Sequence, residues 1–436
     1  MVLFTIVPFL MGTVLPMHKT LDLSAVTIPL VAASTLNTVV WLSIYIIHHL
    51  VTNKVVNHQR KFMINRKIYP IRYNHYSPLV SIIIPARNEE NVIKKTVLNC
   101  LQQTYKNIEV IIVCHNSYDG TYQEARAVDD TRVRAFDFKT TESGKGLALN
   151  YGIDHAKGEY ICIVDSDAKL DINFIQNIMP LFDEGYAAIQ GKIMPSNRQY
   201  NLLTRLLSLE GDLFSVPFMT TRTFLDKRTP LGGTGFVINK EILIQVGKFG
   251  NSLIDDFELS FRLFRNKFRI AFAPLSVVYD EKPPRFDIIF SQRSRWMKGH
   301  LDLLRHRIAE PRDILGNIYW LSPVFTLCGL LAIGIAAFAI IFSIFVGYYP
   351  YTFAFLPVKI WIISTSLIFV LQTSLLIRES EIKNFKNVLN AGLLMLFANY
   401  WYVVLVKAFF VKSWANTKTT HGFQIPSLQE ATSKLA

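Results

Sequence analysis

Cysteine is scarce in this sequence, with four residues in 436. Their spacing matches neither a disulfide framework nor a set of metal ligands. We therefore expect reduced, structural thiols and a reducing compartment for the soluble part of the chain. Linkers rich in glycine, serine or proline, low-complexity tracts and internal repeats are also lacking, so nothing indicates a repeat protein. The four cysteines are Cys100, Cys114, Cys162 and Cys328.

Acidic residues are outnumbered, with 33 Asp and Glu against 46 Lys and Arg and a net charge of +13. Such a charge could indicate nucleic acid, but here the basic residues concentrate beside apolar segments. This pattern is typical of a cytoplasmic membrane face, so we expect a lipid bilayer and no nucleic acid as partner. Residues 53–78 contain Lys and Arg but no acid, which predicts that this segment and the domain after it are cytoplasmic.

Apolar residues are abundant: they make up half of the chain, and several apolar runs are long enough to cross a bilayer. Residues 26–51 are the strongest candidate, and residues 318–346, 353–377 and 388–411 give three more. Residues 2–17 are apolar but short and contain prolines, so they cross the membrane, lie in its interface or act as an anchor; we expect crossing. The sequence predicts a multi-pass protein of the cell membrane, with the number of spans and the side of the tail left open.

The middle of the chain, residues 79–279, alternates short β-branched runs with amphipathic segments of helical length. This alternation predicts an α/β domain with a mostly parallel, Rossmann-like sheet covered on both faces. Ligands of such sheets bind at the carboxyl ends of the strands, where this sequence is polar. The expected strands are residues 80–84, 108–113, 133–138 and 160–164, and the expected helices are near 91–102, 121–128, 145–155 and 257–265.

The predicted segments of the whole chain follow from these patterns. They are membrane residues 1–52, a basic linker at 53–78, the α/β domain at 79–284, an amphipathic helix at 285–312, membrane helices at 313–411 and a tail at 412–436. The amphipathic helix has apolar and aromatic residues at helical spacing over 286–304, with Arg293, Arg295 and Lys298 between them. Beside membrane spans this indicates an interfacial helix, and an ordinary surface helix is the alternative.

The turn Asp165-Ser166-Asp167 directly follows the apolar run 160–164. Two carboxylates one residue apart at the end of a buried strand supply hard oxygen ligands, which suit Mg²⁺ or Mn²⁺ bridging to a diphosphate. Asp and Ser are also common in ordinary turns, so a purely structural role is the alternative.

Seven short motifs follow one another along residues 84–296. They are Ile84-Pro85-Ala86-Arg87-Asn88-Glu89-Glu90, Asn116-Ser117-Tyr118-Asp119-Gly120-Thr121, Gly144-Lys145-Gly146-Leu147-Ala148-Leu149-Asn150, Asp165-Ser166-Asp167, Gly232-Gly233-Thr234-Gly235-Phe236, Asp255-Asp256-Phe257-Glu258-Leu259-Ser260 and Gln292-Arg293-Ser294-Arg295-Trp296. In this order, ahead of C-terminal spans, they resemble the membrane-embedded family 2 glycosyltransferases that include cellulose, hyaluronan, chitin and poly-N-acetylglucosamine synthases. The resemblance covers roughly residues 79–300 in detail and implies a GT-A catalytic domain.

The resemblance also implies which acidic residues act. The first aspartate of the family's metal motif lies beside the nucleotide and the second binds the metal, roles that fall on Asp165 and Asp167 with Mg²⁺ or Mn²⁺. A divalent cation there would stabilise the growing charge of the leaving diphosphate. The general base that deprotonates the acceptor falls on Asp256, beside Asp255, where the family often has glutamate. An acidic first helical turn favoured by the helix dipole is a compatible structural role.

Nucleotide contacts are expected from the strand ends and from Lys145, whose neighbouring glycines allow close backbone approach. A solvated lysine at a helix start is the alternative for Lys145. Many relatives carry consecutive aspartates where this chain has Cys114 and His115, so a UDP-sugar is an expectation from the family alone. The expected nucleotide-binding residues are Pro85, Arg87, Glu89, Asn116, Asp119, Lys145 and Asp165.

The C-terminal motif matches the Q-x-x-R-W signature of the polymer-forming branch of the family. There the arginine faces the diphosphate and the tryptophan forms a platform for the acceptor sugar. For Trp296 a plain membrane-interface aromatic is the alternative. The expected acceptor and diphosphate residues are Gly233, Thr234, Gly235, Gln292, Arg293, Arg295 and Trp296.

These expectations lead to three functional hypotheses. The first is an inverting, metal-dependent enzyme that processively extends a β-linked polysaccharide and threads it through its own membrane helices. The second is transfer of a single sugar to a lipid-linked acceptor. The third is a nucleotide-binding transporter or scaffold without catalysis, which would require charged residues inside the spans; beyond Lys359 and Lys407 the apolar runs have nearly none.

Overall fold

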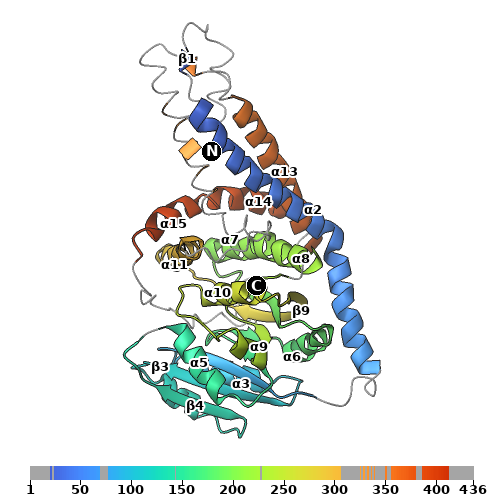
Figure 1. Cartoon of the computed structure of the whole chain (residues 1–436), viewed down its shortest axis with the longest axis vertical. Helices are drawn as coiled ribbons and strands as arrows, with labels where there is room; N and C mark the ends of the chain where they lie inside the picture. Colours follow the sequence, from blue (N-terminus) through green and yellow to red (C-terminus); the bar gives the residue numbers. More distant parts are fainter. Residues whose placement is uncertain are drawn as a thin grey trace, which may run out of the picture. The chain divides into compact units, whose positions relative to one another are not determined.

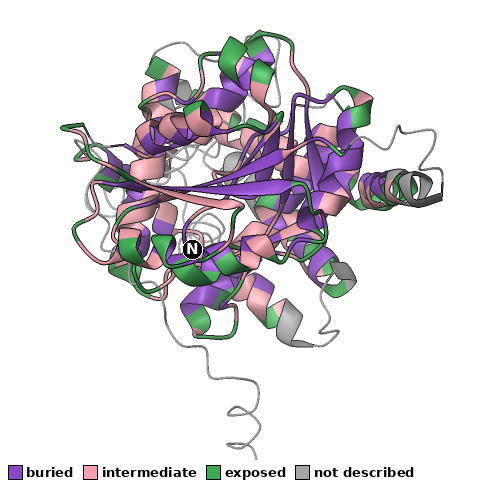
Figure 2. Cartoon of the chain, turned by 90° about the horizontal axis from the view of Figure 1, so that it is seen from below, coloured by how far each residue is buried: buried purple, intermediate pink, exposed green. Residues whose placement is uncertain are grey.

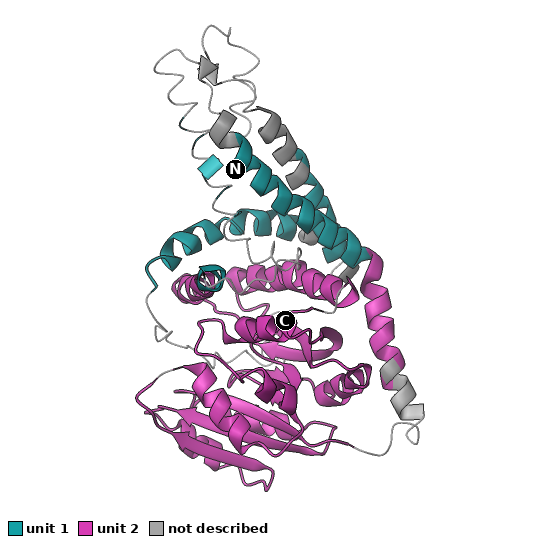
Figure 3. Ribbon diagram, viewed as in Figure 1, with its two compact units in different colours: residues 1–49, 300–411 teal, residues 50–299, 412–436 magenta. Residues whose placement is uncertain are grey.

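The computed structural model describes residues 20–21, 24–68, 77–142, 144–225, 228–305, 349–350, 355–379 and 385–411, with isolated positions between 325 and 338. The chain divides into two compact units (Figure 3). Residues 50–299 belong to one, which we call the α/β unit. Residues 24–49 and the described residues of 300–411 belong to the other, which we call the helical unit. The predicted span 2–17, most of 318–346 and the tail from 412 lie outside the described residues.

The α/β unit is built on an eight-stranded sheet with the order β4-β3-β2-β5-β8-β7-β9-β6. Apolar β-branched runs form its central strands, which are largely buried (Figure 2). All four predicted strands are confirmed as β2, β3, β4 and β5. The strands are β2 Val80–Ala86, β3 Ile108–His115, β4 Val133–Phe138, β5 Tyr160–Ile163, β6 Lys169–Leu170, β7 Ala188–Pro195, β8 Phe236–Asn239 and β9 Ile270–Asp280.

The sheet is mixed, and the prediction of a mostly parallel sheet holds fully for its first half and, in its second half, for the pairing of β7 with β9. Strands β4, β3, β2 and β5 pair in parallel. Strand β8 runs antiparallel to both β5 and β7, and β6 runs antiparallel to β9. The reversal at β8 follows from where this strand begins: Phe236 pairs with Ile163 at the end of β5, so β8 can only run back along it.

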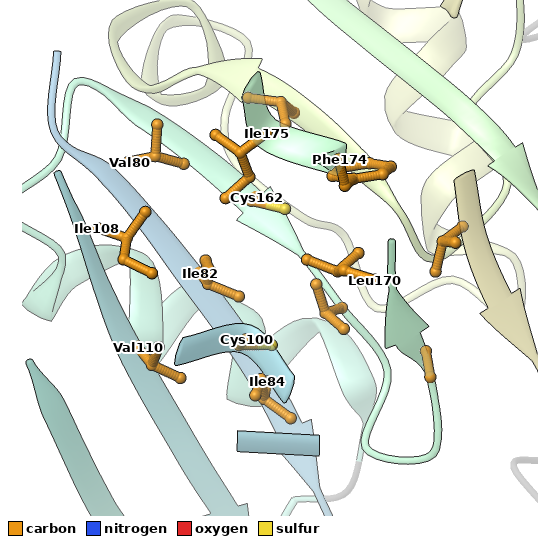
Figure 4. Close-up of a cluster of buried hydrophobic side chains, with 14 of the residues drawn as sticks. Val80, Ile82, Ile84, Cys100, Ile108, Val110, Cys162, Leu170, Phe174 and Ile175 are labelled. Atoms are coloured by element: carbon orange, nitrogen blue, oxygen red, sulfur yellow. The ribbon is translucent and has the colours of Figure 1, made fainter. Parts of the chain in front are cut away.

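Helices cover both faces of the parallel half of the sheet (Figure 1). Because side chains of a strand alternate between its faces, Ile82 and Ile84 point to one layer and Ile83 to the other. The first layer is shared with Cys100 of α3 (Figure 4). In the second, Gly152 of α5 lies against Ile83, with no room for a side chain. The helices here are α3 Ile93–Leu101, α4 Thr121–Arg126 and α5 Lys145–His155, all of which the sequence predicts.

The other half of the α/β unit carries the remaining helical elements. Helix α10 begins at Asp255, two residues earlier than the sequence predicts, and α11 confirms the predicted helix at 286–304. In Figure 1, α7, α8 and α11 lie at the end of this unit away from β3 and β4. The elements are α6 Phe174–Ile178, η2 Met179–Glu184, α7 Leu202–Glu210, η3 Gly211–Ser215, α8 Val216–Leu225, α9 Lys240–Gln245, α10 Asp255–Arg265 and α11 Phe286–Arg305, of which the residues from His300 on belong to the helical unit.

The long helix α2 Ser24–Ile68 contributes its C-terminal half to the α/β unit. Gln59 is buried there, and its Oε1 accepts a hydrogen bond of 2.9 Å from the backbone N–H of Leu275. Its Nε2 donates to Ser276 Oγ at 3.1 Å and to the carbonyl of Asn177 at 3.3 Å. The basic segment predicted as a linker at 53–78 is helical as far as Ile68, and these bonds of Gln59 attach it to the α/β unit.

The helical unit contains the N-terminal half of α2 together with α13 Phe355–Glu379, α14 Phe385–Phe397 and α15 Tyr400–Ala408. Gln372 of α13 donates a buried hydrogen bond of 3.0 Å to the hydroxyl of Tyr45 on α2. In the described part of the chain, two helices have the length and apolar composition of a membrane span, Ile28–Lys61 and Val388–Ala408. These overlap two of the predicted spans, and the predicted span at 353–377 is helical as α13. A short strand pair, β1 Thr20–Leu21 with β10 Tyr349–Pro350, completes the described elements.

Candidate active site

The turn after β5 is held rigidly on both sides. The backbone N–H of Asp165 donates to Thr234 Oγ1 at 3.0 Å, and Thr96 Oγ1 of α3 donates to the carbonyl of Ser166 at 2.6 Å. The N–H of Ala168 closes the turn on the carbonyl of Asp165 at 3.1 Å. Asp165 and Asp167 both remain partly exposed. The turn thus presents two carboxylates from a fixed backbone, as the sequence predicts.

Lys145, the first residue of α5, lies against this turn. Its Nζ is 2.5 Å from Asp165 Oδ1 and 3.0 Å from the carbonyl oxygen of Gly233. The alternative of a solvated lysine is therefore wrong, because its ammonium group is bonded inside the site. The conformation of the helix start depends on close packing, since a Cβ at Gly146 would overlap the carbonyl oxygen of Gly250. Asn150 adds a reciprocal pair with the backbone of Phe249, at 2.9 and 3.0 Å.

The glycine-rich loop at residues 232–235 leads directly into β8, which begins at Phe236. Gly233 and Gly235 have φ of +81° and +62°, a region that favours glycine. A Cβ at Gly235 would also overlap the side chain of Val278. The loop supplies two of the contacts described above, from the carbonyl of Gly233 and the hydroxyl of Thr234. Buried Gln190 of β7, which belongs to none of the sequence motifs, is hydrogen-bonded to three residues of this loop.

Asp255 and Asp256 lie in the first turn of α10, where the helix dipole favours negative charge. A Cβ built on Gly233 would be 3.1 Å from Asp256 Oδ2, so this carboxylate lies directly against the glycine loop. Asp256 Oδ1 accepts a hydrogen bond of 2.8 Å from the N–H of Phe257. Asp255 is buried, and its Oδ2 has no hydrogen-bond partner among the described residues.

The charges of the site act on one another strongly. Burial and then the neighbouring Asp255 raise the pKa of Asp256 to about 7. Burial also raises the pKa of Asp255, although Lys145 and Arg295 oppose that rise. Burial alone would lower the pKa of Lys145, but the carboxylates, Asp165 first, raise it above its ordinary value. Two adjacent carboxylates, of which Asp255 is buried and Asp256 half-buried, can exchange a proton near neutral pH.

The two arginines at residues 292–296 of α11, the segment with the Q-x-x-R-W motif, make different contacts. The guanidinium of Arg295 donates to the carbonyl of Leu253 at 2.8 Å, just before α10. Burial lowers its pKa, and Asp255, Asp256 and Asp165 counteract this, so Arg295 shares the electrostatic environment of the site. Arg293 instead pairs with Glu210 at 3.0 Å.

Arg293 also stacks on a ring of the same motif. Its guanidinium carbon lies 4.2 Å from the ring centroid of Trp296, a cation–π distance. Because Arg293 is paired with Glu210 at the same time, one face of the tryptophan is covered by a fixed cation. Arg295 thus interacts with the carboxylates, whereas the contacts described for Arg293 are those with Glu210 and Trp296.

The loops after β2 and β3 are bonded to each other rather than open. The N–H of Glu89 donates to Thr121 Oγ1 at 2.7 Å, and that of Glu90 donates to Asp119 Oδ2 at 3.3 Å. Asp119 also accepts hydrogen bonds from the N–H and the hydroxyl of Thr121 through its Oδ1. The side-chain amide of Asn116 donates to the carbonyl of Thr140 at 2.9 Å and accepts from the N–H of Thr140 at 3.0 Å.

Two of the residues expected to bind nucleotide, Asn116 and Asp119, thus use the polar atoms of their side chains in hydrogen bonds within the protein. Arg87, by contrast, is exposed at the end of β2, beside the half-buried Pro85. Burial and the charge of Arg87 lower the pKa of His115, and burial raises the pKa of Cys114 to about 12. The end of β3 therefore carries two buried side chains, Cys114 and His115, that are uncharged at neutral pH.

Within the described ranges no group of three or more His, Cys, Asp and Glu residues gathers as a complete metal cluster. Mg²⁺, however, is usually bound by one or two carboxylates and by phosphate oxygens of the substrate. The turn with Asp165 and Asp167 fits that requirement, because both carboxylates are partly exposed on a backbone fixed by Thr96 and Thr234. One oxygen of Asp165 is bonded to Lys145.

Comparison with known proteins gives one family. The model described as "Glycosyltransferase like family 2" matches residues 77–299. The probable glycosyltransferase YdaM of Bacillus subtilis is 27% identical over 77% of this chain and 83% of its own length. The beta-monoglucosyldiacylglycerol synthase of Trichormus variabilis is 31% identical over 51% of this chain and 49% of its own length, so the chain spans about half of that relative.

Among solved structures, a mannosyltransferase of Pyrobaculum calidifontis, PcManGT, in complex with GDP-Man and Mn²⁺, has the same fold. The TM-score is 0.50 at 18% identity, and the match covers 81% of this chain and 99% of that one. The mixed sheet with its helices on both faces is therefore a GT-A-like fold.

Proposed function

Because this chain belongs to glycosyltransferase family 2 and is therefore a glycosyltransferase, we propose that it is an inverting, metal-dependent enzyme. It moves a sugar from a nucleotide sugar, with a UDP-sugar as the expected donor, to an acceptor hydroxyl. The observation that carries the proposal is the meeting of Asp256, the Lys145–Asp165 ion pair and Arg295 around one glycine loop. A base and two cations are the groups that this reaction requires.

Asp256 is proposed as the general base. In the transfer step an acceptor oxygen bonds to the anomeric carbon, the bond from that carbon to the diphosphate oxygen breaks, and the acceptor proton passes to Asp256. A carboxylate with a pKa near 7 is a good proton acceptor at neutral pH. The buried neighbour Asp255 contributes to this raised pKa through its charge.

Lys145 and Arg295 are proposed to stabilise the leaving diphosphate. Both are held in place before any substrate binds, Lys145 by Asp165 and Gly233, and Arg295 by the carbonyl of Leu253. Fixed cations cost no reorganisation when charge develops in the transition state. Asp167, with Asp165 beside it, is proposed to hold Mg²⁺ or Mn²⁺, which when bound supplies further positive charge at the diphosphate.

Two acceptors are proposed. A growing β-linked polysaccharide is supported by the Q-x-x-R-W motif, whose Trp296 keeps a partly exposed ring on α11. A lipid acceptor is supported by the similarity to a beta-monoglucosyldiacylglycerol synthase. We further propose that the enzyme is a multi-pass membrane protein with a cytoplasmic α/β unit, which is supported by the two apolar helices and by the basic residues that follow the first.

The proposal is tested with purified full-length protein and a panel of nucleotide sugars. Release of nucleoside diphosphate is measured with Mn²⁺, with Mg²⁺ and with chelator, and we expect release with one sugar and only with metal. The labelled product is then sized: a ladder indicates a polymer, and a single addition that extracts into organic solvent indicates a lipid acceptor. Absence of release with every sugar and metal would refute the proposed function.

A further inference from the structure

The loop at residues 232–235 contacts three members of the proposed site. The carbonyl oxygen of Gly233 accepts from Lys145 Nζ at 3.0 Å, and Thr234 Oγ1 accepts from the N–H of Asp165 at 3.0 Å. The Cα of Gly233 lies against the carboxylate of Asp256. The shape of this loop therefore sets the relative positions of the proposed base, the cation and the turn with the aspartates.

Glycines cannot set this shape themselves. Gly233 and Gly235 adopt positive φ, but glycine populates many other conformations about as readily. Two backbone hydrogen bonds of 2.8 Å fix the end of the loop: Gly235 N–H donates to Ile163, and Gly191 N–H donates to the carbonyl of Gly235. The beginning and middle of the loop, from Gly232 to Thr234, need another constraint.

Gln190 on β7 supplies that constraint from inside the protein. Its side chain is fully buried, and Oε1 accepts a hydrogen bond of 2.8 Å from the N–H of Gly232. Nε2 lies 3.0 Å from the carbonyl oxygen of Thr234 and 3.1 Å from that of Gly235. An N–H group can only donate and a carbonyl can only accept, so the orientation of the amide is determined. A single planar group thus ties the first residue of the loop to its last two.

We propose that Gln190 is a positioning residue for glycosyl transfer, which keeps the loop at residues 232–235 in the one conformation that aligns Lys145, Asp165 and Asp256. The proposal rests on the proposed roles of those three residues. An apolar side chain at this place would leave the Gly232 N–H and the Thr234 carbonyl without this hydrogen-bond partner, which is unfavourable inside a protein. An ionised glutamate at this place would put a negatively charged oxygen beside the carbonyl oxygens of Thr234 and Gly235, which carry partial negative charge.

The chain offers a matched control. Gln103 is also fully buried, its Nε2 donates to the carbonyl of Asp171 at 2.7 Å, and its Oε1 accepts from the N–H of Ile175 at 3.1 Å. It therefore makes the same kind of contact between segments of backbone, but at the region around α6 rather than at the loop. Gln190→Met and Gln103→Met each remove a buried amide that is hydrogen-bonded to backbone groups, and only the first should affect the proposed site.

The experiment compares the two variants with the wild-type full-length protein in detergent. Hydrogen exchange of backbone amides, followed by mass spectrometry of peptides covering residues 228–240, reads the loop without relying on activity. We expect exchange in this peptide to accelerate at least about tenfold in Gln190→Met and to be unchanged in Gln103→Met. We expect kcat to fall about 10–100-fold in Gln190→Met, since small misplacements of catalytic groups have effects of this size. Thermal midpoints should fall by similar amounts in both variants.

Each other outcome counts against the proposal. Equal losses of kcat in the two variants, or unchanged exchange at residues 228–240 in Gln190→Met, would show that Gln190 contributes only to stability. If Gln190→Met does not fold, Gln190→Glu and Gln103→Glu are compared by the same two measurements. If neither variant of Gln190 folds while both variants of Gln103 do, Gln190 is a folding residue and the proposal is overturned. A wild-type protein that releases no nucleoside diphosphate refutes the proposed function instead, and the exchange measurement still decides the role of Gln190 in the loop.

Discussion

The ammonium group of Lys145 lies 2.5 Å from one carboxylate oxygen of Asp165, although the two residues are 20 positions apart in the sequence. Lys145 opens α5 and Asp165 lies in the turn after β5, so parallel strands and their crossover helix bring the pair to one edge of the sheet. The contact pairs Asp165 with a cation, beside the proposed metal ligand Asp167. It also places a cation where the diphosphate is proposed to bind.

Replacing Lys145 tests this pair. We expect Lys145→Gln to lower kcat/KM for the donor by about 10²-fold, because a charge-assisted contact to phosphate is lost. Asp165 would also lose its partner, so the thermal midpoint should decrease. The control is Lys248→Gln, which removes a lysine paired with the largely exposed Asp154; surface pairs contribute about 0–1 kcal/mol. Similar kinetics for the two variants would rule out a role of Lys145 in the reaction.

Asp256→Asn should abolish transfer. The amide cannot accept the acceptor proton, and loss of a general base typically costs about 10²–10⁴-fold in rate. Binding of the nucleotide sugar, measured by calorimetry in the presence of Mn²⁺, should be retained. Glu258→Gln changes another acid of the same helical turn, which pairs with Arg262 at 3.3 Å, and should leave turnover within a few-fold of wild type. Turnover by Asp256→Asn above one tenth of the wild-type rate would refute the assignment.

The pH dependence of kcat/KM should reflect the raised pKa of Asp256. The base acts only when ionised, and its pKa in the free enzyme is about 7. The rate should therefore fall on the acid side with a midpoint near pH 7, well above the ordinary value for an aspartate. The measurement is initial-rate kinetics between pH 5 and pH 9 at constant ionic strength, with binding checked at each pH. A midpoint near 4 would show that another group limits the rate.

Stability should respond in the opposite direction to activity. A carboxyl group whose pKa is raised on folding stabilises the folded protein at low pH, and this contribution is lost as the pH rises through the folded pKa. Ionised Asp256 is thus unfavourable above pH 7, next to buried Asp255. Because this loss is spread between the unfolded pKa near 4 and the folded pKa near 7, we expect the gain in unfolding free energy from Asp256→Asn to be larger at pH 8 than at pH 5, by on the order of 1–3 kcal/mol. Denaturant unfolding of the protein in detergent, at both pH values, measures this; an equal effect at both would contradict it.

The tryptophan of α11 should affect the acceptor and not the donor. Trp296 has one face covered by Arg293, which Glu210 holds at 3.0 Å, so the ring is fixed for stacking on a sugar. We expect Trp296→Ala to raise KM for the acceptor about tenfold or more with KM for the nucleotide sugar unchanged, and Trp296→Phe to be milder, since aromatic stacking contributes about 0.5–1.5 kcal/mol. A parallel change of both KM values would indicate a structural role only.

The parallel half of the fold could be predicted because its signals are local. Runs such as residues 110–113 are uniformly apolar and β-branched, and the helix at residues 145–155 begins between two glycines, so alternation in the sequence identifies both. The second half could not be predicted in this way. The direction of β8 depends on its pairing with Ile163, which lies more than 70 residues earlier, and no local pattern carries that information.

The site residues likewise divide into those whose role the sequence indicates and those whose contacts only the fold determines. Asp165, Asp256, Lys145 and Arg295 belong to motifs whose chemistry is visible in the sequence, and the fold brings them together. Asn116 and Asp119 look equally suited to bind a ligand, yet their polar atoms are used to join neighbouring loops. Whether a polar side chain faces the substrate or the backbone is decided by tertiary contacts.

Gln190 shows the reverse case, a residue without a visible motif that contacts the site. The only signal in the sequence is a polar residue inside an otherwise apolar strand, at residues 187–191. A buried amide in such a place must find hydrogen-bond partners. This rule predicts that Gln190 is bonded but cannot name the loop to which it is bonded.

Helix α2 has a practical consequence for work with the enzyme. Gln59 accepts from the N–H of Leu275 and bonds Ser276, so a recombinant fragment that starts at the first strand, near residue 77, would expose these buried groups on a newly created apolar surface. A fragment that starts near residue 50 would keep this stretch of helix and its hydrogen bonds to Leu275 and Ser276 of β9. Truncation screens for soluble protein should therefore begin upstream of the boundary that sequence similarity alone would recommend.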